Sequence, residues 1–492
     1  MRINRHRRAA GAAAVATALA LVAAQPSPAA AHTVAPDAVF AKILVKQVTG
    51  AHAKKHLDAL QAIATAHGGN RAAGTPGYDA SRDYVADKLR RAGYQVTLDP
   101  IDFVRDWTEN NPPTLNLTAP GGKVYVPNQD FLTFQPSPPG DVTAQVQAVD
   151  LTLPPTPAPT STSGCETSDF DGFVAGRIAL IQRGTCGFAT KVRNAGFAGA
   201  SGIIVFNEGQ PGRTDAYPLD IGEWRAAIPM VFADFAVGNE LAATPGATVR
   251  LKVDATLTLG TNHNVIAETR FGNPNNVVMA GAHLDSVPEG PGINDNGSGT
   301  AAVLETALQM RHFPVRNKVR FAFWAAEEIG LLGSDQYVEE LTTAQRDRIK
   351  LYLNFDMVAS PNYAYKLYDG DDSDATGSPA GPPGSAQIEK QLAAFFDARG
   401  LGHVGADFDG RSDYGPFIAV GIPAGGVFTG AEGIKTPEEQ ALFGGTAGAS
   451  YDGCYHQACD TIGNVDLTAF DVNADAIADS VARFAFDTTA IP

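Results

Sequence analysis

Carboxylate and imidazole side chains stand directly after three apolar runs of this sequence. In open α/β sheets, ligands bind beyond the carboxyl ends of the parallel strands. If the runs are such strands, we expect the side chains that follow them to converge on one crevice. The runs and their polar successors are 277–280 with His283 and Asp285, 319–324 with Glu327 and Glu328, and 351–355 with Asp356.

These residue types suit a divalent metal used for hydrolysis. Carboxylate oxygens and imidazole nitrogens bind such ions, and a hydrolytic site keeps one coordination position open for water. Of the ten histidines, only His283 and His456 lie among acids in turn-like sequence. A further acid, Asp295, lies in the glycine-rich segment 293–299 before a predicted helix. A neighbouring asparagine or serine can cap that helix, which leaves Asp295 free to bind a cation.

Glu327 and Glu328 are adjacent carboxylates at the end of an aromatic strand. Neighbouring side chains in an extended backbone point in opposite directions. One glutamate can therefore bind metal while the other remains free as a general base, which must lie near the attacking water without being a ligand. Two adjacent glutamates alone also fit a solvated turn, so the surrounding acids and histidines carry this interpretation.

The elements that would position these residues alternate between strands and helices. Helices at 53–66 and 78–92 precede a strand at 95–103, and the alternation returns after Gly260. The pattern predicts an α/β fold with a mixed, mostly parallel central sheet flanked by helices. The expected later strands are 276–281, 320–325, 351–356 and 421–428, and the expected later helices are 300–310, 388–399 and 474–486.

A β-rich insert interrupts this alternation. With 492 residues the chain should form two or three folding units. Proline-rich turns begin near Asn111, and the first pattern resumes near Thr258. We predict an inserted domain at 111–257 and a discontinuous main domain at 32–110 and 258–492. The insert lacks a cluster of acids with a histidine or a nucleophile, so no chemistry is expected from it.

Residues 1–31 have the pattern of a signal peptide, with early arginines, an apolar run at 9–24 and three alanines at 29–31. The alternative, a membrane anchor, is disfavoured because the run is shorter than the ~20 residues that cross a bilayer. The pair Arg7-Arg8 raises twin-arginine export, but general secretion is favoured. The chain is thus expected to be extracellular. Whether 32–52 is a propeptide stays open.

Net charge and cysteine content limit the possible partners and the cellular compartment. The net charge is −16 without runs of like charge, which disfavours nucleic acid and anionic membranes as partners. Four cysteines permit three pairings, and export implies oxidation. The simplest pairing joins Cys165 to Cys186 and Cys454 to Cys459. A structural zinc site around the last pair is the alternative, but only two thiols lie nearby.

Taken together, the motifs resemble those of the secreted co-catalytic dizinc aminopeptidases of the streptomycete type in metallopeptidase family M28. The resemblance covers about 54–104 and 260–488. The insert resembles a protease-associated (PA) domain through Gly184, Cys186 and Phe188 and through 199–207. The peptidase motifs are AHLDSV at 282–287, GINDNGSG at 292–299, AEE at 326–328, NFDM at 354–357, GRSD at 410–413 and CYH at 454–456.

The resemblance implies a zinc exopeptidase fold and two Zn²⁺ ions per chain. Asp295 would bridge the ions, Glu327 would be the general base, Tyr455 would donate a hydrogen bond to the developing oxyanion, and Asp285 would orient the ring of His283. No ligand position is substituted, which argues against an inactive binding relative. The implied ligands besides Asp295 are His283 and Asp356 on one ion and Glu328 and His456 on the other.

The resemblance also implies a substrate. Arg411 would orient substrate or product, and Met357 and Phe428 would line an apolar pocket, although plain core packing explains both equally well. We therefore predict a secreted aminopeptidase that hydrolyses the N-terminal bond of peptides or proteins through a metal-bridging water activated by Glu327. It should prefer large apolar N-terminal residues such as Leu, and it should be a monomer. The sequence defines no partner for the PA domain.

Two alternative functions and one doubtful metal ion, calcium, remain. A metallo-carboxypeptidase or another amidohydrolase could use the same scaffold. A binding module with a decayed peptidase core is disfavoured by the intact ligand set. Asp471 and Asp475 resemble a calcium site of some relatives, but the acid that would complete it aligns with Gln47, so calcium is doubtful.

Overall fold

The computed structural model of the chain describes residues 36–220, 228–375 and 377–492. The predicted signal peptide at 1–31 lies outside these residues. Within the described ranges, no helix combines the length and hydropathy needed to cross a bilayer. The first helix, α1 (Pro36–Gln47), buries Phe40 and Leu44 in the main core, where Phe40 meets the ring of Phe313 at 4.5 Å between centroids.

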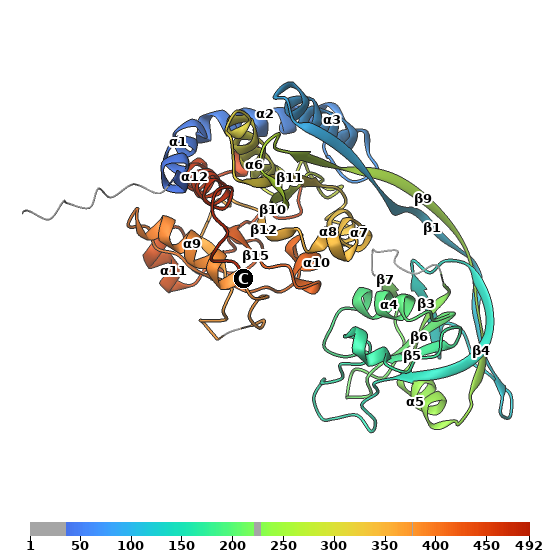
Figure 1. The fold of residues 1–492 in the computed structure, drawn as a ribbon. Helices are drawn as coiled ribbons and strands as arrows, with labels where there is room; N and C mark the ends of the chain where they lie inside the picture. The colour runs from blue at the N-terminus through green and yellow to red at the C-terminus, as the bar shows by residue number, and fades with distance from the viewer. Residues whose placement is uncertain (1–35, 221–227, 376) are drawn as a thin grey trace, which may run out of the picture. The chain divides into compact units, whose positions relative to one another are not determined.

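A mostly parallel sheet forms the centre of the larger part of the chain (Figure 1). Strand β10 lies between β11 and β12 and is parallel to both, and β12 is parallel to β15. Helices cover the sheet on both faces, so the predicted fold class is confirmed. The strands are β10 (Asn273–His283), β11 (Asn317–Trp324), β12 (Ile349–Phe355), β13 (Lys366–Tyr368), β14 (Val404–Ala406) and β15 (Ala424–Phe428).

The side chains of the central strands alternate between two apolar cores. Val278, Ala280 and Leu353 enter the core beneath the first set of helices, whereas Met279 and Tyr352 enter the core on the other face. Burial on both faces explains why these strands read as continuous apolar runs. The first set is α1, α2 (Gly50–Ala66), α3 (Pro76–Arg91), α6 (Gly297–Met310), α9 (Ser385–Asp397) and α12 (Leu467–Phe484), and the second is α7 (Leu332–Glu340) and α10 (Tyr414–Ala419).

Helix α6 begins directly behind the predicted metal-binding segment. Asn296 is its N-cap and accepts a hydrogen bond from the Gly299 amide at 2.9 Å. A side chain at Gly299 would collide with the carbonyl oxygen of Phe355, which explains the glycine. Because Asn296 caps the helix, the carboxylate of Asp295 is not used for that purpose.

The insert forms a second sheet whose parallel core is β4, β5, β6 and neighbouring β8. Helix α4 packs on one face of it through Val192, and helix α5 packs on the other through Leu241. The disulfide Cys165–Cys186 lies before α4. The elements are β2 (Lys123–Val124), β3 (Phe131–Gln135), β4 (Gly140–Val149), η1 (Thr167–Phe170), β5 (Ile178–Gln182), α4 (Phe188–Phe197), β6 (Gly202–Phe206), β7 (Leu219–Asp220), β8 (Met230–Ala233) and α5 (Phe235–Ala243).

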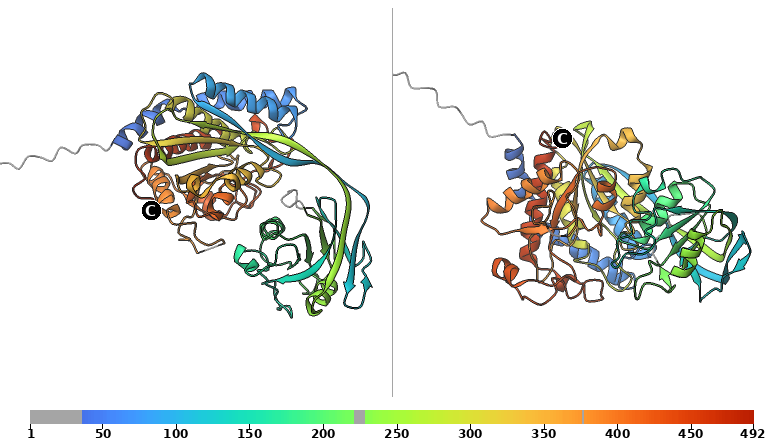
Figure 2. Two further views of the ribbon diagram at one scale, coloured as in Figure 1. Left: turned by 45° about the vertical axis from the view of Figure 1, so that its right-hand side comes forward. Right: turned by 90° about the horizontal axis from the view of Figure 1, so that it is seen from below.

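Two long antiparallel strands, β1 (Gln95–Ala119) and β9 (Thr248–Glu268), run side by side through both sheets (Figure 2). One end of β9 pairs with β11, and the other end pairs with β4. The predicted domain boundaries near 110 and 257 fall inside these strands and stay a prediction. The remaining elements are α8 (Thr343–Arg346), α11 (Pro437–Phe443) and η2 (Ile462–Asn464).

Replacing Leu353 by alanine should destabilise the main part of the chain. Its side chain is fully buried in β12, and truncation of a buried leucine costs about 3 kcal/mol through lost burial and the cavity left behind. Urea unfolding followed by tryptophan fluorescence would measure the effect. Leu442→Ala is the control because Leu442 is 56% exposed, and a change below about 0.5 kcal/mol is expected there. Equal effects would contradict the placement of Leu353.

Candidate metal centre

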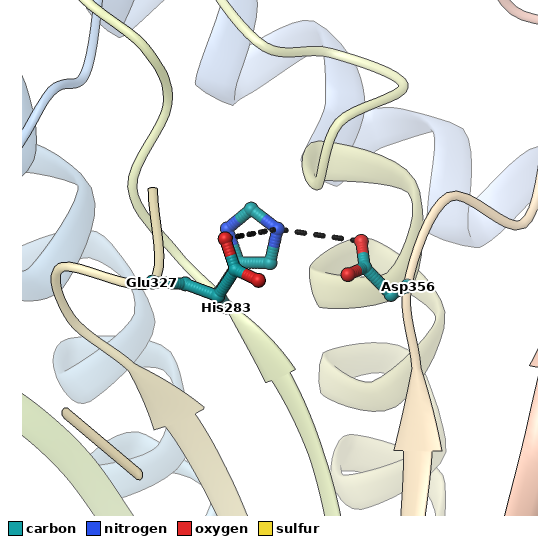
Figure 3. A group of neighbouring side chains, drawn as sticks. All are labelled: His283, Glu327 and Asp356. Carbon is teal, nitrogen blue, oxygen red and sulfur yellow. Dashed lines mark ion pairs between the residues drawn. The ribbon is translucent and has the colours of Figure 1, made fainter. Parts of the chain in front are cut away.

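The predicted acids and histidine meet at the carboxyl ends of three parallel strands. His283 is the last residue of β10, Asp356 directly follows β12, and Glu327 lies in the loop after β11. Figure 3 shows the ring of His283 between the carboxylates of Glu327 and Asp356. Parallel alignment brings these ends to one edge of the sheet, as the sequence pattern indicated.

Asp295 lies between the two histidines. Its Oδ1 is 3.2 Å from His283 Nε2, and its Oδ2 is 3.3 Å from His456 Nε2. Around His283 Nε2 there is also Asp356 Oδ1 at 3.3 Å, and around His456 Nε2 there is Glu328 Oε2 at 2.9 Å. The five side chains thus form two adjacent groups that share Asp295, one group on each of its oxygens.

Glu327 is placed differently from these five residues. Its Oε2 lies 3.8 Å from His283 Nε2, farther away than the oxygens of Asp295 and Asp356. The side chain is 9% exposed and borders the cavity at the site. This position suits a carboxylate that faces substrate rather than a cation.

The unsatisfied atoms of the cluster point to cations. Asp356 Oδ1 and Glu328 Oε1 are buried acceptors that receive no hydrogen bond from the described residues, although His283 Nε2 lies 3.3 Å from Asp356 Oδ1. A buried carboxylate oxygen without a hydrogen bond costs substantial free energy. Three buried or half-buried carboxylates, those of Asp295, Glu328 and Asp356, beside two imidazoles match the oxygen and nitrogen donors that zinc prefers. The residues present therefore fit two divalent cations.

The close packing of acids and histidines at this site also shifts their pKa values. Burial would raise the pKa of Asp295, but hydrogen bonds from His283 and His456 hold it well below its usual range. Burial and the neighbouring Asp295 raise the pKa of Glu328 to about 8. Burial would lower the pKa of His456, but its bonds to Asp295 and Glu328 outweigh this and raise it to about 10. Burial also raises the pKa of Glu327.

Asp285 ties two of the ligand segments together. Its Oδ1 lies 3.6 Å from His283 Nδ1 and accepts the Glu327 amide at 3.2 Å. Its Oδ2 accepts the Glu328 amide at 3.3 Å. The carboxylate therefore holds the backbone that carries the paired glutamates beside the ring of His283.

A buried chain of hydrogen bonds ends on Asp356. Trp324 Nε1 donates to Tyr352 Oη at 2.8 Å, and Tyr352 Oη donates to Asn354 Oδ1 at 3.0 Å. Asn354 Nδ2 donates to Ser412 Oγ at 2.9 Å, and Ser412 Oγ donates to Asp356 Oδ2 at 2.6 Å. Each hydroxyl accepts once and donates once, so the direction of the chain is fixed. It leaves Asp356 Oδ1 free to face a cation.

A second network connects Asp295 to the loop that carries His456. Asp460 Oδ2 accepts the Asp295 amide at 3.0 Å, and its Oδ1 accepts the Asn294 amide at 2.8 Å. Asp460 directly follows the disulfide Cys454–Cys459, which closes the loop around Tyr455 and His456. Asp295 and His456 are thus held by the carboxylate of Asp460 and by one disulfide.

Arg71 organises the segment between the first two ligands. The side chain is fully buried, and it donates to the carbonyl oxygens of Pro291 at 2.9 Å, Gly292 at 2.6 Å and Leu284. Burial lowers the pKa of Arg71 to about 10 despite the nearby carboxylates. It therefore remains a cation at neutral pH and offsets part of the negative charge of the cluster.

The metal centre opens into a cavity of about 670 Å³. Met357 and Phe428 both line it, so the structure places them at the pocket, although Met357 is only 3% exposed. The ring of Tyr455 stacks on His456 at 3.8 Å between centroids, and Arg411 Nη2 donates to its hydroxyl at 3.4 Å. Burial and the nearby carboxylates of Asp295 and Glu328 raise the pKa of Tyr455, so its hydroxyl keeps its proton.

Four non-glycine residues around this cavity adopt left-handed backbone conformations. They are Ala326 (φ 58°), Leu331 (φ 59°), Met357 (φ 48°) and His456 (φ 55°). Such conformations are uncommon for residues with a Cβ and persist where surrounding contacts enforce them. The backbone of the ligand loops is therefore held in place rather than relaxed.

The two acids of the doubtful calcium site have protein partners. Asp471 Oδ1 accepts the Gly50 amide at 2.7 Å, and Asp475 Oδ2 lies 3.5 Å from Arg399 Nη2. Burial raises the pKa of Asp475 to about 6. Their carboxylates stabilise the start of α2 and the end of α9.

Sequence reasoning assigned no role to several residues that support the site. Ser412 belongs to the GRSD motif, Arg71 precedes the helix predicted at 78–92, and Asp460 follows the cysteine loop, but nothing in their spacing shows what they contact. Their partners are up to 221 positions away, as for Arg71 and Gly292.

Comparisons with known proteins agree with this geometry. Residues 264–481 match peptidase family M28, and residues 143–241 match the PA domain. An aminopeptidase of Pseudomonas aeruginosa is 49% identical over 426 residues, which cover 86% of this chain and 78% of that protein. Leucine aminopeptidase 2 of Trichophyton equinum is 46% identical over 336 residues, 67% of this chain and 66% of that protein.

A solved structure has a similar fold. The aminopeptidase from Aneurinibacillus sp. strain AM-1 is 28% identical and superposes with a TM-score of 0.51. The match covers 90% of this chain and 95% of that one. Both the central sheet and the insert therefore have counterparts in a solved protein.

Binding of zinc to the metal-free protein should release protons. At pH 7 the raised pKa values of His456 (about 10) and Glu328 (about 8) keep protons on the cluster, and these must leave when a metal binds. Calorimetry in buffers of different ionisation enthalpy should report about two protons or more. His456→Ala should lower the count, and the exposed His312→Ala should not. An enthalpy independent of buffer would contradict the shared protons.

The raised pKa of His456 also makes the stability of the metal-free fold depend on pH. The folded-state pKa of His456 lies above the unfolded value of ~6.5. Its contribution to the metal-free fold is therefore fully present below pH ~6.5 and is lost as the pH rises through about 10.

Proposed function

The chain is a metallo-aminopeptidase that belongs to peptidase family M28, and from this premise we propose that it is an exported enzyme with two zinc ions. It removes large apolar residues such as leucine from the N-termini of peptides. The observation that carries the proposal is Asp295, whose two oxygens face His283 and His456 at 3.2 and 3.3 Å. A carboxylate shared in this way suits a pair of cations.

In this proposal one group of residues binds each zinc ion, and a third group carries out catalysis. His283 and Asp356 would hold one zinc, Glu328 and His456 the other, and Asp295 both. When bound, such a pair acidifies water and polarises the scissile carbonyl. Three carboxylates against two dications leave a small positive charge, which favours a developing oxyanion.

Glu327 is the general base in this proposal. Its carboxylate borders the cavity without being among the closest neighbours of either histidine. It takes a proton from the attacking water and passes it to the leaving amine. In the metal-free protein burial raises the pKa of Glu327, and nearby cations would lower it again and so favour the carboxylate that accepts the proton.

Tyr455 stabilises the oxyanion that forms from the substrate carbonyl, and Arg411 helps to hold Tyr455 in place. The Tyr455 hydroxyl keeps its proton because burial raises its pKa, so it can donate a hydrogen bond to the oxyanion. Stacking on His456 and the bond from Arg411 fix its position. Arg411 also pairs with Glu432 at 2.8 Å and is exposed at the rim of the cavity.

The preference for leucine rests on the apolar wall of the cavity. Met357, Phe428, Tyr368 and Tyr414 line the same cavity as Asp295, Glu328, Asp356 and His456. An apolar side chain of the N-terminal residue would be removed from water there, at about 25 cal/mol per Å² of buried surface. Met357 also adapts readily to different side chains.

Export is supported by the leader pattern and by the disulfides. Arginines followed by an apolar run and three alanines precede the described chain. All four cysteines are paired, as Cys165–Cys186 and Cys454–Cys459. Such bonds form and persist in oxidising compartments.

Cleavage should require a free amino terminus. Leucine p-nitroanilide should be hydrolysed, and its N-acetylated form should lose at least about 100-fold in kcat/KM, because an acetyl group removes the charge of the amino group and adds bulk beside it. Equal cleavage of both compounds would assign the chain to the endopeptidases or amidohydrolases instead.

The two adjacent glutamates should give opposite results when changed. Glu327→Gln should keep two equivalents of zinc and lose about 10²–10⁴-fold in kcat, which is the usual contribution of a general base. Glu328→Gln should bind less zinc because it removes a ligand charge. Metal analysis after dialysis, together with turnover, would separate the roles. Loss of zinc from Glu327→Gln would make Glu327 a ligand.

A further inference from the structure

A second cavity of about 1170 Å³ lies between helix α4 of the PA domain and helices α7 and α10 of the peptidase part. Gly330, Leu331 and Gly410 line both this cavity and the one at the metal centre. The two spaces are therefore adjacent and share a wall. Two of the three shared residues are glycines, and a Cβ at Gly410 would meet nothing within 4 Å.

An ion pair joins the two sides of the second cavity. Arg193 Nη1 donates to Asp335 Oδ1 at 3.0 Å and to Asp335 Oδ2 at 2.9 Å. The side chain of Arg193 is 23% exposed and that of Asp335 is 8% exposed. A partly buried contact of this kind orients α4 against α7, which follows the loop of the paired glutamates.

Apolar side chains on both walls are exposed to this space. Phe197 is 66% exposed, and it lies four residues after Arg193 on α4, so both face the same side of that helix. On the opposite wall Val420, at the end of α10, is 36% exposed. Both line the cavity. Exposed apolar surface beside a catalytic cavity indicates a place where apolar groups of a ligand bind.

We propose that the residues of a peptide substrate on the C-terminal side of the scissile bond bind in this second cavity, against Phe197 and Val420. The proposal rests on the aminopeptidase function above. The N-terminal residue occupies the first cavity, and the rest of the peptide must leave the metal centre through an opening. The second cavity adjoins the first at Gly330, Leu331 and Gly410, so it is a space beside the metal centre that this part of the peptide can occupy. The PA domain then contributes directly to binding, with a preference for extended peptides that carry apolar downstream residues.

The experiment compares a short and a long substrate in the full-length enzyme. Leucine p-nitroanilide reaches only the first cavity, whereas a leucyl hexapeptide with valine and phenylalanine downstream reaches both. Phe197→Ala should lower the ratio of kcat/KM for the hexapeptide over that for the anilide by about 5–10-fold, the usual effect of truncating an aromatic contact. The change should appear in KM rather than in kcat, because Phe197 does not contact the reacting atoms.

The matched control is Phe271→Ala. Phe271 is also exposed, at 48%, but it lies in the turn between β9 and β10 and does not line the cavity. This variant should leave the ratio unchanged. Arg193→Ala, which removes the ion pair, should lower the ratio in the same direction as Phe197→Ala.

Three outcomes distinguish the proposals. A fall of the ratio in Phe197→Ala and Arg193→Ala but not in Phe271→Ala supports the downstream site. An unchanged ratio in Phe197→Ala, with the wild-type enzyme active on both substrates, overturns it and leaves the aminopeptidase function intact. If the wild-type enzyme cleaves neither substrate, the proposed function itself fails.

Discussion

The structure depends on gathering several buried carboxylates at one edge of a sheet. Asp295, Glu327, Glu328 and Asp356 lie within a few ångströms of His283, and like charges at such separations repel strongly when water is excluded. The cluster is stable only with compensating positive charge. Protons supply it in the metal-free state, which explains the raised pKa values, and two dications would supply it in the active state.

The residues around this cluster fix its geometry through directional hydrogen bonds rather than through steric contacts. Asp285, Asp460 and Ser412 each use a polar group to fix one ligand segment, so the oxygens that remain free point inward. The buried cation Arg71 holds three carbonyl oxygens of the loop between His283 and Asp295. Pre-organised ligands pay little reorganisation cost when a metal or a transition-state charge appears.

The two sheets are connected by paired strands, and this connection limits how the PA domain can move relative to the central sheet. Strands β1 and β9 continue from the central sheet into the PA domain without a flexible linker. A paired ribbon is stiffer than single-stranded linkers, and Arg193 with Asp335 adds a second contact. The PA domain can therefore present a defined surface near the proposed metal centre, although none of the predicted catalytic residues lies in it.

The sequence by itself determined the chemistry of the site and most of the central strands. His283, Glu328 and Asp356 each follow a local apolar run, and a buried strand can be recognised from such a run alone. Helix α12 was predicted from its amphipathic spacing, but it begins at Leu467 rather than 474 because Asp466 caps it. The short helices α7 and α10 have too few turns to show a periodic pattern.

Only the tertiary structure decided how the ligands are supported and where a peptide can go. The hydrogen-bond chain from Trp324 to Asp356 crosses two strands and a loop, and Asp460 reaches Asp295 across 165 positions. The second cavity combines residues 165–197 of the insert with residues 330–420 of the peptidase part. Contacts of this kind depend on packing between distant segments, and a local pattern in the sequence carries no record of them.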